Sequence, residues 1–168
     1  MIIGIAGKKG SGKSFTARCL CEALGTYPWE WDTNSFAQHM KVIVEHIIEP
    51  QHGVSGIDKD KNEVLRSGIT RRKAYQLAAD FFRTVNPGFT IDCVSLGKGD
   101  KYIFDDVRYP NEIEWIHSKG GKVFYLTGRG DYTDTHESEN AIDPEDCDHV
   151  IDNAGPIEDT VKQILEIL

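Results

Sequence analysis

The hydrophobic positions of the chain form two kinds of pattern that follow one another: short continuous apolar runs, and longer segments in which apolar residues recur at helical spacing. The apolar runs predict buried strands at residues 1–6, 101–107, 122–126 and 149–152. The stripes predict amphipathic helices at residues 14–24, 34–48, 70–86, 110–119 and 157–168. Because strands alternate with helices, we expect a three-layer α/β domain in which helices flank a parallel sheet.

The stripes also predict which helix residues are buried. On the helix at 34–48 the stripe consists of Phe36, Met40, Ile43, Val44, Ile47 and Ile48. The next helix takes Thr70 as its N-cap, since a threonine hydroxyl there can accept a bond from a helix N–H group. Its stripe predicts burial of Ala74, Leu77, Ala78, Phe81 and Val85. Residues 50–68, which are polar and rich in glycine, predict a long loop between the two helices.

Composition limits the class of protein. The 168 residues predict one domain, and 39% hydrophobic with 27% charged residues is ordinary for a globular protein. No apolar run approaches the roughly 20 residues that span a bilayer, and no signal-peptide pattern opens the chain. Four cysteines without metal-binding spacing predict reduced thiols, and therefore a cytoplasmic protein with no membrane partner (in the host cytoplasm if it is viral).

The charges are unevenly distributed. The formal net charge is −8, which argues against binding of duplex nucleic acid. Between Asp131 and Asp159 there are eleven acidic residues and no Lys or Arg. Five arginines lie near predicted loop edges instead: Arg71, Arg72, Arg83, Arg108 and Arg129.

The strongest motif lies between the first predicted strand and the first predicted helix. It fits G-x-x-x-x-G-K-[ST] at every fixed position and comprises Gly7, Lys8, Lys9, Gly10, Ser11, Gly12, Lys13 and Ser14. Glycines let the backbone N–H groups converge on an anion at a helix N-terminus. Lys13 can reach the β- and γ-phosphates of a nucleotide, and the Ser14 hydroxyl can bind Mg²⁺. The motif therefore predicts a phosphate loop.

A phosphate loop needs a carboxylate on the metal side. The apolar run at 101–107 leads into Asp105 and Asp106, which places both at the carboxyl edge of the sheet, where ligands bind. The pattern alone does not choose between them. The [NT]-K-x-D segment that reads guanine in GTPases is missing, so the loop, the carboxylates and the five arginines favour a small phosphotransferase with a second substrate site.

Several motifs together resemble the phage-type deoxynucleoside monophosphate kinases, relatives of the adenylate-kinase-like P-loop kinases. Besides the phosphate loop they are Phe36-Ala37 with Lys41, the helix from Gln76 to Arg83, D-V-R-Y-P-N-E at 106–112, Gly120-Gly121, H-E-S-E at 136–139 and D-H-V-I-D-N-A-G at 148–155. The resemblance covers most of the chain. It implies one P-loop kinase domain over residues 1–168, with an acceptor-binding insertion at about 33–100 and a lid at about 128–144.

The resemblance implies a role for each matching residue. Lys13 and Ser14 would hold ATP and Mg²⁺, and Asp106 would be the metal-side carboxylate. Arg83 and one of Arg71 and Arg72 would bind the phosphate of the acceptor, near Lys41, and Gln76 would read its base. Arg129 would reach the transferring phosphoryl group from the lid, Asn153 to Gly155 would touch the adenine side of ATP, and His136 with Glu139 would orient the lid or the acceptor.

The expected partners are therefore small molecules, ATP and a deoxynucleoside monophosphate (dNMP), with the protein a monomer or a homodimer. The accepted base stays open, because Ala79-Asp80 and Phe89 stand where the family pattern has Gly-Thr and a tryptophan.

Two alternatives remain. The segment at 148–155 also resembles the dephospho-coenzyme A kinases, and a nucleotide-binding regulatory module without transfer activity would need only the phosphate loop.

Overall fold

The computed structural model describes residues 1–25, 30–48, 61–97 and 101–168. The chain forms two compact units: the first combines residues 1–35 with 95–168, and the second comprises residues 36–94. Of the helices in the described ranges, none has the length and apolar character needed to cross a bilayer.

The first unit is built on a five-stranded sheet in the order β2-β3-β1-β4-β5, with every neighbouring pair parallel. The strands are β1 (Ile2–Gly7), β2 (Asp32–Asn34), β3 (Tyr102–Val107), β4 (Lys122–Thr127) and β5 (His149–Asp152). Because the strands run in one direction, their carboxyl ends meet at one edge of the sheet. The phosphate-loop motif follows β1, and Asp105 and Asp106 end β3 at the same edge.

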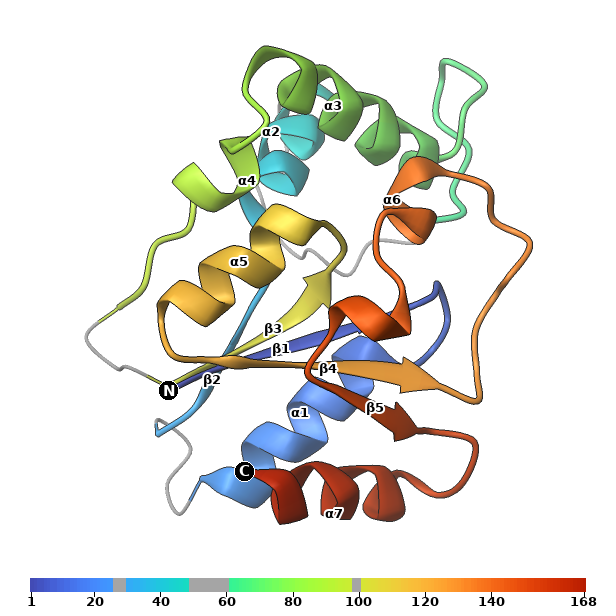
Figure 1. Cartoon of the computed structure of the whole chain (residues 1–168). Coiled ribbons are helices and arrows are strands. Elements are labelled where there is room, and N and C mark those ends of the chain that lie inside the picture. The colour runs from blue at the N-terminus through green and yellow to red at the C-terminus, as the bar shows by residue number, and fades with distance from the viewer. Residues whose placement is uncertain (26–29, 49–60, 98–100) are drawn as a thin grey trace. The chain divides into compact units, whose positions relative to one another are not determined.

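Helices cover both faces of this sheet. Helices α1 (Lys13–Leu24) and α7 (Ile157–Ile167) lie side by side on one face, and α5 (Pro110–Ser118) covers the other (Figure 1). Between the sheet and the first pair lies a core of buried side chains that includes Ile3, Ile5, Leu20, Phe124 and Ile164. The three-layer α/β fold with a phosphate loop predicted from the sequence is confirmed.

One strand was not predicted, and it displaces a predicted helix start. Strand β2 consists of Asp32, Thr33 and Asn34, pairs only with β3, and is mostly exposed. An edge strand without an apolar face gives no hydrophobic signal. The predicted helix start at Asn34 is therefore wrong, and α2 begins at Gln38.

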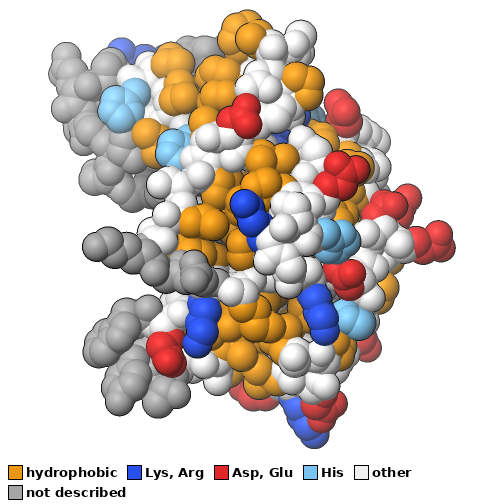
Figure 2. All heavy atoms as spheres, turned by 60° about the vertical axis from the view of Figure 1, so that its left-hand side comes forward, with side chains coloured by type: hydrophobic (Ala, Val, Ile, Leu, Met, Phe, Trp, Pro, Cys, Tyr) orange, Lys and Arg blue, Asp and Glu red, His pale blue; other side chains and the backbone are white. Residues whose placement is uncertain are grey.

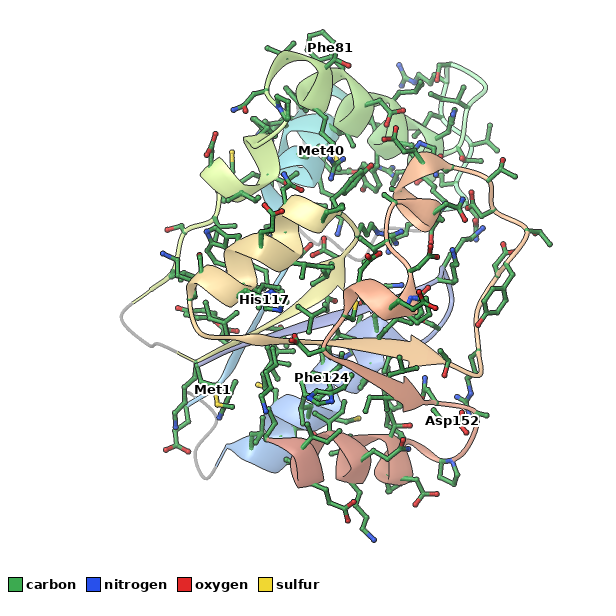
Figure 3. All side chains as sticks on the ribbon, in the orientation of Figure 1. Met1, Met40, Phe81, His117, Phe124 and Asp152 are labelled. Carbon is green, nitrogen blue, oxygen red and sulfur yellow. The ribbon has the colours of Figure 1, made fainter. Side chains whose placement is uncertain are left out.

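The second unit contains the helices α2 (Gln38–Ile48), α3 (Arg71–Val85) and α4 (Phe89–Asp92). The predicted N-cap of α3 is confirmed, because the Thr70 side chain accepts a hydrogen bond from the Lys73 N–H group. The core of the unit consists of Met40, Val44 and Tyr75, with Phe82 stacked on Phe89 beside them. Met40 of α2 packs with Tyr75 of α3 in this core (Figure 3).

Three of the five positions predicted to be buried on α3 are wrong, whereas Ala74 and Ala78 pack against the core of the second unit. Leu77, Phe81 and Val85 are 49%, 64% and 70% exposed, and Phe81 points away from α2 (Figure 3). On α2, the predicted core residues Ile43 and Ile47 are also exposed. Hydrophobic side chains reach the surface on the face in Figure 2 as well. The apolar stripe was read correctly, but α3 packs through a neighbouring face that contains charged and phenolic groups.

That face centres on Arg71, the largest fully buried side chain in the described ranges. Its Nη1 donates to both carboxylate oxygens of Glu45, and its Nε and Nη2 donate to Glu63. The Tyr75 hydroxyl also donates to Glu45, and this bond together with burial raises the pKa of Tyr75. A buried ion pair is stable only when its hydrogen-bonding groups are satisfied, so this network determines which face of α3 packs inward. Of the predicted loop at 50–68, residues 50–60 lie outside the described residues.

Arg71→Met should lower the free energy of unfolding by about 3–5 kcal/mol, because it leaves the buried Glu45 carboxylate without its cation at similar side-chain volume. Urea denaturation followed by circular dichroism measures the loss. The control is Lys162→Ala, which removes an exposed pair with Glu166 and should cost less than about 0.5 kcal/mol. A loss below about 1 kcal/mol for Arg71→Met would show that the network does not stabilise the second unit.

Candidate active site

The phosphate-loop motif forms a tight turn from the end of β1 into the first turn of α1. Gly7, Gly10 and Gly12 have φ angles of 138°, 75° and 90°, a region that L side chains rarely adopt. At Gly12 a Cβ atom would also lie 3.0 Å from Nδ2 of Asn153. Glycine is therefore required at Gly12 by both backbone conformation and space.

Lys13 folds back onto this loop. Its Nζ donates to the carbonyl groups of Gly7 and Lys8 at 2.6 and 2.8 Å. Burial lowers its pKa to about 7, and the positive charge of Arg108 adds to the effect, while Glu139, Asp106 and Asp105 oppose it. All four groups therefore act electrostatically on the lysine. A cation that burial destabilises in this way gains most from an anionic ligand such as a phosphate chain.

The carboxylate of Asp106 is held in place by Ser35. The Ser35 hydroxyl donates to Oδ2 of Asp106 at 2.5 Å, and the Ser35 N–H group donates to the side chain of Asn34 at the end of β2. Ser35 was not predicted, because a serine after a polar edge strand carries no motif signal. The strand order explains it, since β2 and β3 are neighbours and end at the same edge.

The oxygen donors at this edge fit Mg²⁺. Within the described ranges no group of three or more acidic, histidine or cysteine side chains could hold a metal. Magnesium in phosphotransferases is held by one or two protein oxygens, phosphate oxygens and water. The Ser14 hydroxyl and one carboxylate of Asp105 or Asp106 would supply the protein ligands.

A segment from the acidic part of the chain lies against the phosphate loop. We call residues 131–140 the strap. Asp131 forms an isolated β-bridge with Lys9, whose Nζ also lies 3.2 Å from Asp131 and 3.6 Å from Asp134. The Lys8 Nζ donates to the backbone carbonyl of Glu139. Lys8 and Lys9 of the motif thus hold part of the segment predicted as a lid, and closure of that lid stays a prediction.

His136 and Glu139 lie in the strap with different roles. His136 caps the single-turn helix α6 (Glu137–Asn140), because its side chain accepts a hydrogen bond from the Ser138 N–H group. Glu139 accepts a bond from the Lys9 N–H group at 2.8 Å and another from Arg108 Nη1 at 2.5 Å. The structure thereby brings Glu139 and Arg108 together with the phosphate loop.

The loop after β5 supports the phosphate loop from another side. Asn153 is buried; its Nδ2 donates to the Ser11 carbonyl at 2.6 Å, and its Oδ1 accepts from Thr160 on α7. Arg129 Nη2 donates to the carbonyl groups of Ala154 and Gly155. Asn153 therefore contacts the backbone of the phosphate loop, and Thr160 is a further supporting residue that the sequence did not indicate.

The predicted acceptor residues lie in the second unit. Lys41 is on α2, and Arg71, Arg72, Gln76 and Arg83 are on α3. Arg72, Gln76 and Arg83 are four and seven residues apart, so they share one face of the helix, and all three are half-buried. Arg71 differs from them, because its guanidinium is enclosed by Glu45 and Glu63.

One protein-family model matches part of this chain. Residues 82–164 match the family model of deoxynucleotide monophosphate kinase, which covers a little under half of the chain. This match confirms the family resemblance seen in the sequence. A search of curated protein sequences finds no significant match.

Similar solved structures include three kinases. Shikimate kinase from Aquifex aeolicus is 13% identical with a TM-score of 0.48, and the alignment covers 99% of this chain and 95% of that one. The APS kinase CysC of Mycobacterium tuberculosis is 13% identical with a TM-score of 0.47, covering 99% and 94%. A gluconokinase from Sinorhizobium meliloti is 14% identical with a TM-score of 0.47, covering 98% and 89%.

Asn153 could support the phosphate loop or contact the adenine of ATP, and the two roles predict different effects on ATP and GTP binding. If its side chain supports the phosphate loop, Asn153→Ala should weaken ATP and GTP binding by a similar factor, about tenfold. Asn153→Asp should be at least as damaging, because a carboxylate oxygen would face the Ser11 carbonyl where an N–H group now donates. Isothermal titration calorimetry with both nucleotides measures this. Asp152→Ala, which changes the exposed last residue of β5 next to Asn153, is the control. Weakened ATP binding with unchanged GTP binding would instead indicate contact with adenine.

Proposed function

We propose that this chain, an ATP-dependent kinase similar to the deoxynucleotide monophosphate kinases, transfers the γ-phosphate of ATP to a deoxynucleoside monophosphate. The products are ADP and the deoxynucleoside diphosphate. The bond between the γ-phosphorus and the β,γ-bridging oxygen breaks, and an oxygen of the acceptor's phosphate forms the new bond to phosphorus.

The observation that carries this proposal is the family match over residues 82–164 in a chain with a phosphate loop at 7–14. The two features lie in different parts of the sequence, so they support the proposal independently. The match points to the acceptor, and the phosphate loop points to the donor nucleotide. A regulatory module would account for the loop alone.

The chemistry requires position and charge more than proton transfer. The acceptor is already an anionic phosphate, so no general base is needed. Lys13, now bonded to loop carbonyl groups, would turn to the β- and γ-phosphates. Arg108 lies close enough to lower the pKa of Lys13 and would supply a second positive charge at the transferring group. Arg129 would have to leave the carbonyl groups of Ala154 and Gly155 to reach the same group from the lid.

Magnesium would bind on the carboxylate side of the loop. When bound, it would neutralise charge on the phosphate oxygens. Ser14 and Asp106 are the ligands that we propose, with Asp105 as the alternative carboxylate. Ser35 favours Asp106, because a hydrogen bond to one carboxylate oxygen fixes the orientation of the other.

The acceptor would bind on the face of α3 that Arg72, Gln76 and Arg83 share. Arg83 and Arg72 would contact the phosphate, Gln76 the base, and Lys41 on α2 would add a charge. Arg71 is omitted from this set, because the carboxylates of Glu45 and Glu63 occupy its donors.

Purified protein with Mg²⁺ and ATP should release ADP in a coupled assay when a dNMP is added. The panel is the four common dNMPs and dephospho-coenzyme A, and Lys13→Ala is the inactive control, expected to lower kcat by about a hundredfold or more. ADP release with dephospho-coenzyme A alone would transfer the assignment to that substrate. Absence of ADP release with every dNMP at saturating ATP would refute the proposed function.

Arg83→Ala should raise the KM for the dNMP more than it lowers kcat and leave the KM for ATP nearly unchanged. The acceptor's phosphate carries similar charge in the ground and transition states. Loss of the Arg83 contact therefore weakens the binding of both states equally, which raises KM and not the barrier of the chemical step. Arg83→Lys should restore little, because ammonium cannot reproduce the planar bidentate contact. Steady-state kinetics with each substrate varied in turn decide the matter. An unchanged KM for the dNMP would show that Arg83 only contributes to folding.

A further inference from the structure

Glu139 is a buried carboxylate whose two oxygens bind different parts of the first unit. Its side chain is 1% exposed. Oε2 accepts the N–H group of Lys9 in the phosphate loop, and Oε1 accepts Nη1 of Arg108, which follows β3. Burial of a carboxylate is costly unless it is paired and hydrogen-bonded. Both conditions are met here by groups of the candidate active site.

The bond to Glu139 holds one end of the Arg108 guanidinium. Nη1 donates both to Oε1 of Glu139 and to the carbonyl group of Ser138 at 3.1 Å. The Arg108 backbone is fixed as well, because its N–H group donates to Glu112 on α5. The residue is thus anchored to α5 through its backbone and to the strap through one nitrogen of its side chain.

The other end of the guanidinium is available. Within the described ranges, Nε and Nη2 of Arg108 donate to no protein group, and the side chain is 23% exposed. These two nitrogens form the edge of the guanidinium that can bind two oxygens of one phosphate group. Arg71 makes the contrast clear, since all three of its nitrogens bind carboxylates.

Glu139 places this edge beside the phosphate loop. Its carboxylate binds both Arg108 Nη1 and the Lys9 N–H group of the loop, and the Lys8 Nζ donates to its backbone carbonyl group. Two cations that repel each other need a carboxylate between or beside them to remain close without a ligand. Glu139 can have this effect without contacting the nucleotide.

We propose that Glu139 is a positioning residue: through Nη1 it holds Arg108 so that the free Nε–Nη2 edge of the guanidinium binds the transferring phosphoryl group. The proposal rests on the phosphoryl transfer inferred above. It revises the expectation that Glu139 orients the acceptor, because its partners are Arg108 and the phosphate loop.

Nucleotide affinity without any acceptor tests the proposal. In the presence of Mg²⁺, calorimetric titration of the full chain compares ATP with ADP, which lacks the γ-phosphate. Arg108→Met should weaken ATP binding by about tenfold, with ADP binding nearly unchanged. Glu139→Gln should lower the ATP-to-ADP affinity ratio by a similar or smaller factor, while the weakened bond to the Lys9 N–H group affects both nucleotides alike. The amide keeps the shape but can accept only one of the two bonds, without charge.

The double variant distinguishes positioning from an independent effect. If Glu139 acts through Arg108, Glu139→Gln should change the ATP-to-ADP affinity ratio by less than about twofold in the Arg108→Met background. Asp131→Asn is the matched control, a carboxylate of the same strap that contacts Lys9 but not Arg108, and it should leave the ATP-to-ADP affinity ratio unchanged. Thermal denaturation of each variant verifies folding.

Three outcomes would overturn the proposal. Equal weakening of ATP and ADP by Glu139→Gln would mean that Glu139 only supports the loop. Effects that multiply in the double variant would mean that the two residues act separately, and unchanged affinities would remove the role altogether. Because no acceptor is present, the cycle can succeed even if every dNMP fails as a substrate, so the two proposals fail separately.

Discussion

A phosphate loop has to direct its N–H groups at a ligand, so groups outside the loop must stabilise its conformation. In this chain the stabilising groups come from three places. Asn153 binds the Ser11 carbonyl, Asp131 donates its N–H group to the Lys9 carbonyl, and Glu139 accepts the Lys9 N–H group. Each of the three lies more than 120 residues in sequence from the loop residue that it binds. The parallel sheet brings these residues to the loop. Strand β1 lies beside β4, and β4 lies beside β5, so the segments that follow β4 and β5 start at the same edge of the sheet as the phosphate loop.

This dependence explains which parts of the structure the sequence could predict. The phosphate loop is local: its glycines, Lys13 and Ser14 are adjacent in the chain, and a strand and a helix flank it. Strands β1, β3 and β4 were predicted because they are apolar and largely buried, and β5 was predicted from a short apolar run of which only Ile151 is buried. Strand β2 is polar and was missed, since its position depends on hydrogen bonds to β3 and not on hydrophobic burial.

The errors in the second unit have a related cause. Hydrophobic periodicity assumes that the buried face of a helix is its apolar face. On α3 the inward face includes Arg71 and Tyr75, whose polar groups are satisfied by Glu45, while Phe81 is exposed. A charged residue becomes a core residue only through a partner on another segment, and the sequence does not reveal that partner. The roles predicted for Arg83 and Gln76 also depend on partners outside their helix, which the sequence does not reveal.

The acidic segment after Asp131 illustrates how charge is balanced locally. A protein with a net charge of −8 has to attract an anionic nucleotide, so the field near the loop matters more than the total. Asp131 and Asp134 pair with Lys9, and Glu139 pairs with Arg108. These pairs offset part of the repulsion among the cations at the loop while no phosphate is bound. The number of donors that remain then separates the arginines. Arg71 has bonds from all three nitrogens, whereas Arg108 is held at one end and, in the role that we propose, would offer the other end to a phosphate group.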